Sequence, residues 1–291
     1  MRRDAIEVFH GTNHRLAAYG RYRSVITVHD LALERFPQHS KKIFGQRWAS
    51  WRSSRAFARA DRIIAVSHQT AQDLHDYYRI PLERINVVHH GGSLARNVDH
   101  TDITLEFLKQ RYGLHGGGYI LHVGGGGPRK NISGLLEAYS MLGDLRRRYQ
   151  LVLVGGMGRW MEQIAQKMRQ LDLTNDVVIT GYVAQEHLVA FYRHASLFVY
   201  PSLYEGFGIP PLEAMASGIP VITSNTSSLP EVVGDAAVLV DPLQPATLAQ
   251  SIKAILNDAS IGESLRQKGL SRVKEFSWEQ TARNTLAVYT G

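Results

Sequence analysis

The sequence predicts an α/β protein of two domains, each built on a doubly wound parallel sheet. The chain has 291 residues, a length that favours two domains over one. Short apolar runs alternate with stretches of helical periodicity, as in parallel sheets whose strands are joined by helices. With 44% hydrophobic and 20% charged residues, the chain can also bury a sizeable core.

The expected elements follow one another in a strand-helix order. In the first part of the chain, strands are expected at 6–9, 25–28, 62–66 and 85–88. In the second part, strands are expected at 119–123, 150–154, 177–180, 196–200, 220–223 and 236–240. Helices are expected between them, for example at 131–143, 159–171, 185–194 and 209–217, with a last one at about 278–289. The polar stretch from His90 to Asp102 separates the two parts, because it follows a strand and has the composition of a linker.

The composition excludes several classes of protein. The sequence has no cysteine, so it has no disulfide, no thiol nucleophile and no cysteine metal site. No long apolar run follows Met1-Arg2-Arg3-Asp4, as a signal peptide would require. No stretch approaches the roughly 20 apolar residues that span a bilayer. A cytoplasmic protein is therefore expected.

The basic charge is concentrated near the N-terminus. Residues 1–62 hold 13 Lys/Arg and 5 Asp/Glu, a net +8, whereas the remainder holds 20 and 21, a net −1. Within the basic segment 41–62, four apolar residues recur at helical spacing: Phe44, Trp48, Trp51 and Ala58. This segment is expected either to pack these side chains into the core or to lie on the inner face of an anionic membrane. Nucleic acid is not an expected partner, because no recognition motif accompanies the charge.

The segment from Tyr200 to Glu213 is the most informative part of the sequence. A buried strand ends at Tyr200, and Gly206 and Gly208 then let the backbone turn sharply and approach a ligand. The helix that follows directs its first free N–H groups at whatever lies beyond the strand end. Glu205 and Glu213 flank this turn. The segment therefore predicts a site for a ligand that carries both phosphate and sugar.

A second glycine segment, Gly124–Gly127, lies between a predicted strand and a helix. Four glycines let backbone amides approach an anion, and the helix N-terminus adds its dipole. Arg129 and Lys130 supply positive charge that suits a departing diphosphate. An ordinary turn with solvated basic residues is the alternative. The glutamate segment downstream favours the phosphate role.

Together these segments resemble the retaining GT-B glycosyltransferases of glycosyltransferase family 4. Glu205 and Glu213 have the spacing of that family's Glu-x7-Glu motif. Further segments match the family in the expected order over nearly the whole chain: Val25–Asp30, Ala60–Ser67, His122–Gly124, Pro128–Asn131, Thr180–Val183 and Phe276–Glu279.

The resemblance implies a GT-B fold, with two Rossmann-like doubly wound domains. Residues 1–98 would form the acceptor-side domain, 99–276 the nucleotide-sugar domain, and 277–291 a helix that crosses back to the first domain. About 100 residues precede the hinge, fewer than such a domain usually needs, so the N-terminal domain is expected to be incomplete. Its first strands, and a glycine-rich loop that helps to hold the acceptor, are expected to be missing.

The resemblance also implies roles for individual residues. Glu213 would accept hydrogen bonds from the donor ribose, and Glu205 would contact the sugar hydroxyls or the charge that develops at the anomeric carbon. Arg129 and Lys130 would stabilise the leaving diphosphate. The other donor contacts are expected from these residues: Gly124, Gly125, Tyr182, Val183, Gly206, Phe207 and Gly208.

His29 is the fourth expected catalytic residue, beside Glu205, Arg129 and Lys130. It follows four apolar or β-branched residues, so it should lie at the carboxyl end of a strand, where open α/β sheets bind ligands. The matching histidine of the family approaches the transferred sugar. The sequence contains no Asp-x-Asp motif, and the family's architecture needs no divalent ion. No metal and no cofactor are therefore expected.

The expected function is that of a retaining hexosyltransferase of the EC 2.4 class, acting on a glycan or lipid-linked acceptor. Mannose from GDP-mannose is favoured over a UDP- or dTDP-sugar, because the Pro-Arg-Lys-Asn and His-Asp segments are similar to those of mannosyltransferase-like members. A non-catalytic or partner-dependent nucleotide-sugar-binding subunit is the alternative, since the acceptor domain is expected to be incomplete. A nicotinamide-dependent oxidoreductase is disfavoured, because the acidic residue that should follow its glycine fingerprint is not evident.

Overall fold

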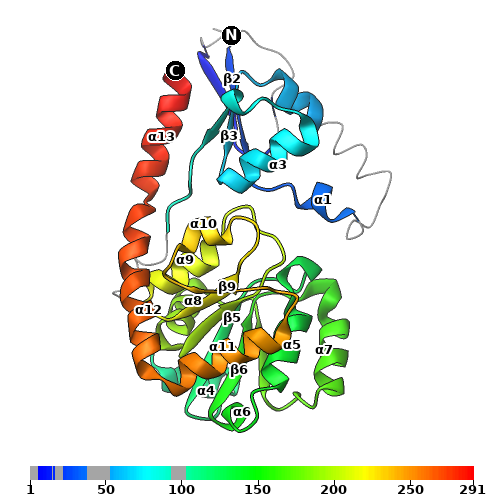
Figure 1. Ribbon diagram of the computed structural model, residues 1–291, viewed down its shortest axis with the longest axis vertical. Helices are drawn as coiled ribbons and strands as arrows, with labels where there is room; N and C mark the ends of the chain where they lie inside the picture. Colours follow the sequence, from blue (N-terminus) through cyan, green and yellow to red (C-terminus); the bar gives the residue numbers. More distant parts are fainter. Residues whose placement is uncertain (1–5, 15, 17–21, 38–52, 93–102) are drawn as a thin grey trace. The chain divides into compact units, whose positions relative to one another are not determined.

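The computed structural model describes residues 6–14, 16, 22–37, 53–92 and 103–291 (Figure 1). The chain forms two compact units. The first unit comprises Met1–Gly91, Glu205–Phe207 and Phe276–Gly291, and the second comprises Gly92–Tyr204 and Gly208–Glu275. The division after Gly91 lies at the end of the first strand-rich part of the chain. The domain boundary expected at residue 98 lies outside the described residues and stays a prediction.

The first unit is built on a four-stranded parallel sheet in the order β1-β2-β3-β4. Its strands are β1 (Val8–Gly11), β2 (Arg23–Val28), β3 (Arg62–Ala65) and β4 (Ile85–Val87). Its helices are α1 (Ala32–Arg35), α3 (His68–Tyr78), η2 (Leu82–Arg84) and α13 (Trp278–Thr290), together with helical residues 53–59.

Helices cover both faces of this sheet, because alternate strand residues point to opposite sides. Ile26 and Ile63 pack with Phe57 and Leu74 on the face of α3. On the other face, residues such as Val25 pack with Val288 of α13. The first unit therefore has three layers, with its sheet in the middle.

The second unit is built on a six-stranded parallel sheet in the order β10-β9-β8-β5-β6-β7. Its strands are β5 (Gly118–Val123), β6 (Tyr149–Val154), β7 (Val177–Gly181), β8 (Leu197–Tyr200), β9 (Val221–Ser224) and β10 (Val238–Val240). Its longer helices are α4 (Leu105–Tyr112), α5 (Ile132–Ser140), α7 (Met161–Gln170), α8 (Gln185–His194), α9 (Ile209–Ala216), α11 (Pro245–Asn257) and α12 (Ala259–Arg272). Its shorter helical segments are η4 (Pro128–Lys130), α6 (Leu145–Arg148), η5 (Gly158–Trp160), α10 (Leu229–Val233) and η6 (Val273–Glu275).

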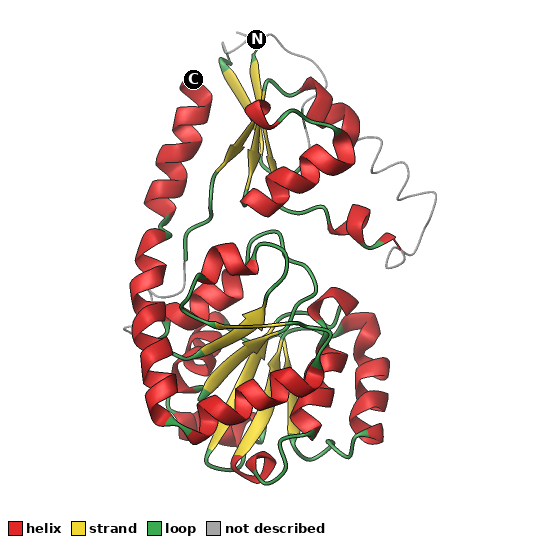
Figure 2. Cartoon of the chain, in the orientation of Figure 1, coloured by secondary structure: helices red, strands yellow, loops and turns green. Residues whose placement is uncertain are grey.

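Helices lie on both faces of the six-stranded sheet (Figure 2). One face packs against α5, α7 and α11, through residues such as Ile120, Leu151 and Val199. The other face packs against α8, where the Phe191 ring lies 6.1 Å from that of Tyr119. Burial on both faces explains why these strands read as continuous apolar runs in the sequence.

The strand order creates a topological switch point between β5 and β8. From β5 the chain proceeds through β6 and β7 to one edge of the sheet, and β8, β9 and β10 then build the other half. The loops that leave β5 and β8 therefore diverge at the same end of the sheet. In open α/β sheets the crevice between such loops is where ligands bind.

The predicted α/β fold with parallel sheets is confirmed. Each of the ten strands in the described part of the chain coincides with an expected run, the largest shift being that of β1 to Val8–Gly11. Among the described residues, no helix is long and apolar enough to cross a membrane.

The basic segment 41–62 is only partly described, because residues 38–52 lie outside the described residues. Phe44, Trp48 and Trp51 therefore have no structural outcome. For Ala58 the core-packing alternative is wrong, because Ala58 is exposed, whereas Phe57 is fully buried. Phe57 and Ala60, three residues apart on one helical face, make the contact with the core.

Candidate functional site

The glycine loop after β5 packs closely against the loop after β6. The N–H of Gly124 donates to the Val154 carbonyl (2.9 Å), and the N–H of Gly126 donates to the Gly156 carbonyl (3.4 Å). A Cβ atom on Gly126 would lie 2.9 Å from the Met157 carbonyl oxygen, so a side chain there would need the backbone to shift. Close packing thus requires some of these glycines, and the N–H groups of Gly124 and Gly126 are engaged within the protein.

Arg129 and Lys130 connect the β5 loop with the β8 loop. The Leu203 N–H donates to the Arg129 carbonyl (2.7 Å), and the Arg129 guanidinium donates to the Tyr204 carbonyl (3.2 Å). The Lys130 ammonium donates to the Tyr200 hydroxyl. Both cationic side chains are half-buried at the switch point. Positive charge therefore lies where the strand order reverses, as a site for a diphosphate requires.

Glu213 is a buried carboxyl group in α9. Its side chain accepts a hydrogen bond from the Tyr192 hydroxyl of α8 (2.9 Å). Burial raises the pKa of Glu213 to about 7, although the hydrogen bond from Tyr192 opposes that rise. The carboxyl group can therefore change its charge near neutral pH. Gly208 precedes the helix with φ of 124°, a conformation that favours glycine.

Tyr182 is the most exposed of the large hydrophobic residues described, with 91% of its surface accessible. It follows β7, whose last residue Gly181 accepts a hydrogen bond from the N–H of Gly155 (2.9 Å). A Cβ atom on Gly156 would lie only 2.4 Å from the Tyr182 ring, so the ring rests on the Gly156 backbone. Val183 beside it is half-buried. The Tyr182 ring thus offers a flat aromatic surface at the carboxyl end of the sheet.

His29 lies directly after β2 in the first unit, within a group of neutral histidines. Its Nε2 contacts the Thr12 carbonyl (2.8 Å), so Nε2 carries a proton, and its Nδ1 lies 3.3 Å from His90 Nε2. The His29 N–H donates to His14 Nε2 (3.1 Å). Burial lowers the pKa of His90 to about 4 and also lowers the pKa of His14, so both rings are neutral near pH 7.

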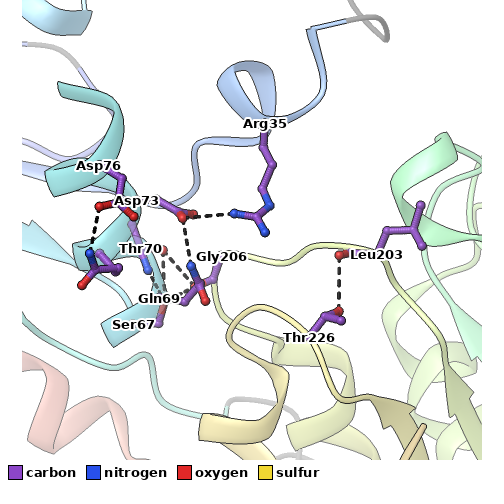
Figure 3. Close-up of polar contacts among 10 residues, drawn as sticks. Arg35, Ser67, Gln69, Thr70, Asp73, Asp76, Leu203, Gly206 and Thr226 are labelled. Atoms are coloured by element: carbon purple, nitrogen blue, oxygen red, sulfur yellow. Dashed lines mark hydrogen bonds and ion pairs between the residues drawn. The ribbon is translucent and has the colours of Figure 1, made fainter. Parts of the chain in front are cut away.

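The Glu205–Phe207 segment belongs to the first unit and lies beside His29. The side chains of Glu205 and Phe207 are buried. A Cβ atom on Gly206 would lie 1.7 Å from the His29 carbonyl oxygen, so only glycine fits there. The Gly206 carbonyl accepts hydrogen bonds from α3, which Figure 3 shows. Residues that are far apart in sequence, His29 and Glu205–Phe207, are thus brought together.

Aromatic rings hold Phe207 in place. Its ring centroid lies 5.4 Å from that of His90 and 5.8 Å from that of Phe276. Sequence reasoning assigned no role to His90 and did not consider His14. The position of His90 at the end of the first part of the chain could have indicated a role in the site. No local sequence pattern marks either His14 or His90 as a site residue.

The expected site residues therefore form two groups, one in each unit. The first unit contains His29, Glu205, Gly206 and Phe207. The second unit contains Gly124, Gly125, Arg129, Lys130, Tyr182, Val183, Gly208 and Glu213. In the second group, Arg129 and Lys130 lie at the switch point, whereas the Glu213 carboxyl group is buried beside Tyr192 and the Tyr182 ring lies on the loop after β6.

Two family models match this chain. Residues 106–272 match the glycosyl transferases group 1, and residues 1–96 match glycosyltransferase family 4. The O-antigen chain mannosyltransferase B of Escherichia coli is 36% identical over 291 aligned residues, which cover 97% of this chain and 74% of that protein. The serotype-specific mannosyltransferase WbdA of Escherichia coli is 34% identical over 80% of this chain, which spans only 29% of WbdA.

Solved structures show the same fold. Sucrose-phosphate synthase from Thermosynechococcus elongatus superposes with a TM-score of 0.77 at 25% identity, covering 93% of this chain and 68% of that one. Anabaena Alr3699/HepE in complex with UDP-glucose superposes with a TM-score of 0.78 at 19% identity, covering 93% and 73%.

Two units built on parallel sheets, the second with a topological switch point, define the class of GT-B glycosyltransferases. The chain belongs to the glycosyl transferases group 1, whose model matches more than half of it, and its first part matches glycosyltransferase family 4. It is accordingly a glycosyltransferase that takes its sugar from a nucleotide sugar.

Proposed function

We propose that this chain transfers mannose from GDP-mannose to a glycan or lipid-linked acceptor, with retention of the anomeric configuration. The observation that carries the proposal is the pairing of Arg129 and Lys130 with the β8 loop at the switch point. Mannose is favoured because relatives at 36% and 34% identity are named mannosyltransferases. GDP is the nucleotide favoured by the resemblance of the Pro128–Asn131 and His29-Asp30 segments to mannosyltransferase-like members. The O-antigen chain named for the first relative supports a polysaccharide acceptor.

In this proposal the second unit holds the nucleotide. Lys130 and Arg129 contact the diphosphate, and their positive charge stabilises it as it leaves. The Glu213 carboxylate accepts hydrogen bonds from the ribose hydroxyls. The backbone of Tyr182 and Val183 contacts the base, and the exposed Tyr182 ring stacks on the base face.

The first unit receives the sugar. Glu205 contacts the sugar hydroxyls or the charge at the anomeric carbon. His29 Nε2 donates its proton to a sugar hydroxyl in exchange for the Thr12 carbonyl that it contacts in the absence of substrate. The amides of Gly206 and Phe207 contact the sugar, and the amide of Gly208, which belongs to the second unit, contacts the distal phosphate. These roles follow from the positions of the residues at strand ends and in the loop that joins β8 to α9.

The chemical step is a front-face displacement. The bond between the anomeric carbon and the diphosphate oxygen breaks, and both of its electrons leave with the diphosphate. The acceptor hydroxyl oxygen then bonds to the same carbon from the same face, and its proton passes to the leaving phosphate. Arg129 and Lys130 take the place of a divalent cation in neutralising the leaving group, so the reaction is proposed to be metal-independent.

The first experiment is a calorimetric titration of the chain with GDP-mannose, UDP-glucose, UDP-N-acetylglucosamine and dTDP-rhamnose. We expect GDP-mannose to bind, Glu213→Ala to weaken binding by roughly tenfold or more, and the exposed control Glu162→Ala to bind like the wild type. Failure of all four donors to bind would contradict the proposal and favour the partner-dependent subunit.

Retention is tested on the product. NMR of the mannosylated acceptor should show the α linkage of the donor, and turnover should be unchanged by EDTA. A β linkage would exclude the front-face step, and loss of turnover with EDTA would exclude metal independence.

A further inference from the structure

The carbonyl group of Gly206 receives two hydrogen bonds from the beginning of α3. Ser67 Oγ donates to it at 2.7 Å and Thr70 Oγ1 donates to it at 3.2 Å. Figure 3 shows both hydroxyls directed at this one oxygen. Two donors to one carbonyl fill both of its lone pairs, which fixes the direction of the C=O bond.

Both hydroxyl groups are rigidly held. The side chains of Ser67 and Thr70 are fully buried. Ser67 is the N-cap of α3 and accepts a hydrogen bond from the Thr70 N–H (3.0 Å), and the two hydroxyl oxygens lie 3.0 Å apart. The N-terminal end of a helix carries a partial positive charge, which also favours a carbonyl oxygen at this position.

The other side of Gly206 is fixed by the backbone of His29. The space that a Cβ atom would need on Gly206 is occupied by the His29 carbonyl, at 1.7 Å, and by Asp30 Cβ, at 2.8 Å. The Gly206 residue is thus held between the hydroxyls of α3 and the segment that follows β2. This arrangement sets Glu205 and Phe207 relative to His29.

The peptide plane carries this constraint to the neighbouring residue. The peptide bond after Gly206 is trans, since the described residues contain no cis bond, so the Phe207 N–H points opposite to the Gly206 carbonyl. Fixing the carbonyl toward α3 therefore aims the Phe207 N–H away from α3. That amide is one of the groups proposed to contact the sugar.

The same helix also anchors α1, which begins two residues after Asp30. Asp73 of α3 is buried and accepts hydrogen bonds from Gln69 (2.9 Å) and from Arg35 of α1 (3.4 Å), as Figure 3 shows. Ser67, Thr70 and Asp73 recur every three residues, on one face of α3. This polar face contacts both Gly206 and α1.

We propose that Ser67 and Thr70 are positioning residues for sugar transfer, which hold the Gly206 peptide so that Glu205 and the Phe207 amide face the transferred sugar. The proposal rests on the proposed function of the loop that follows β8. Neither hydroxyl needs to touch the substrate. The pair acts through the direction of one peptide bond.

The decisive variants are Thr70→Val and Ser67→Ala. Thr70→Val removes only a hydroxyl and keeps the N-cap of α3, so it should lower kcat for mannosyl transfer by roughly tenfold while the Kd for GDP changes less than about twofold. Ser67→Ala should lower kcat further, and Ser67→Thr, which keeps the hydroxyl and the cap, should restore it. If GDP-mannose binds the wild type more tightly than GDP does, this difference in affinity should be smaller in Thr70→Val and in Ser67→Ala.

Thr104→Ala is the matched control, because Thr104 is the N-cap of α4 in the second unit and accepts from the Phe107 N–H (3.2 Å). Thr104→Ala removes a helix cap, as Ser67→Ala does, and should lower the Tm by a similar amount. Unlike Ser67→Ala, it should keep the wild-type kcat. Wild-type kcat in Thr70→Val would overturn the positioning role, as would a parallel loss of GDP affinity. A wild-type chain that binds no donor would overturn the proposed function itself, and the positioning role with it.

Discussion

The two units of this glycosyltransferase differ in the chemistry that they present at their strand ends. The second unit has half-buried cations, Arg129 and Lys130, and a carboxyl group whose pKa lies near neutrality. The first unit has neutral histidines and a segment held by hydroxyl groups. Charge suits a diphosphate, whereas neutral hydrogen-bonding groups suit sugar hydroxyls.

This difference teaches that binding and transfer can be separated by mutation. Substitutions in the second unit should change the affinity for the nucleotide. Substitutions in the first unit should change turnover and leave the affinity for GDP nearly constant.

The largest effect is expected from Gly206→Ala. A methyl group would collide with the His29 carbonyl, 1.7 Å from the Cβ position, so the segment must move. Because a displacement of about 1 Å in a reacting group can lower turnover by roughly 100-fold, kcat should fall by at least that factor while GDP binds normally. Steady-state kinetics and calorimetry measure both.

The matched control is Gly262→Ala in α12. A Cβ atom there meets its nearest neighbour at 3.5 Å, an ordinary contact, so kcat should not change. If Gly206→Ala abolished GDP binding as well, the assignment of separate tasks to the two units would be wrong.

Lys130→Met should come next, and it should affect binding as well as turnover. It removes the ammonium that donates to the Tyr200 hydroxyl and that is proposed to face the diphosphate. A charged hydrogen bond corresponds to roughly 30-fold in affinity, so the Kd for GDP should rise by about that factor. Calorimetry with GDP provides the measurement.

Lys274→Met, an exposed lysine of the same unit, is the control and should bind GDP like the wild type. Equal affinity of Lys130→Met and Lys274→Met for GDP would remove Lys130 from the diphosphate site.

The affinity for GDP should depend on pH through Glu213. Its pKa of about 7 means that the carboxylate form, which accepts hydrogen bonds from the ribose, rises about tenfold between pH 6 and pH 8. GDP should accordingly bind about tenfold more tightly at pH 8 than at pH 6. In Glu213→Gln this dependence should disappear, and a persisting dependence would assign it to another group.

Glu213 should also make the free energy of unfolding depend on pH, in the opposite direction to the affinity for GDP. The folded-state pKa lies above the usual value of 4.5, so the folded protein holds a proton that the unfolded chain releases. The resulting stabilisation is complete below about pH 4.5 and is lost as pH rises through about 7. The Tm without ligand should therefore fall between pH 5 and pH 8 more steeply for the wild type than for Glu213→Gln.

The smallest effect is expected from Tyr182→Ala. Loss of the exposed ring that rests on Gly156 should weaken GDP binding by roughly fivefold, as expected for one stacking contact. Tyr182→Phe keeps the ring and should bind like the wild type. Inorganic pyrophosphate, which has no base, should bind the wild type, Tyr182→Ala and Tyr182→Phe with equal affinity. A difference in pyrophosphate affinity would mean that the ring does not act through the base.

The strands and the loops of the second unit were predictable because their signals are local. A buried parallel strand is a continuous apolar run, and Gly206, Gly208 and Glu213 mark the following turn within a few residues. The hydrogen bond between Ser67 and Gly206 joins residues 139 positions apart, and no local pattern encodes such a contact. Phe57 was missed for a related reason, because helical spacing alone did not fix which residues face the core.

The packing of α13 has a consequence for the order in which this chain can fold during synthesis. Val25, Ile64 and Val88 of the first unit share a core cluster with Val288. That face of the four-stranded sheet stays uncovered on the ribosome until nearly 200 further residues have been translated, because Val88 and Val288 are that far apart. The second unit, whose strands lie between Gly118 and Val240, can reach its native state earlier. The four-stranded sheet therefore completes its core after the second unit.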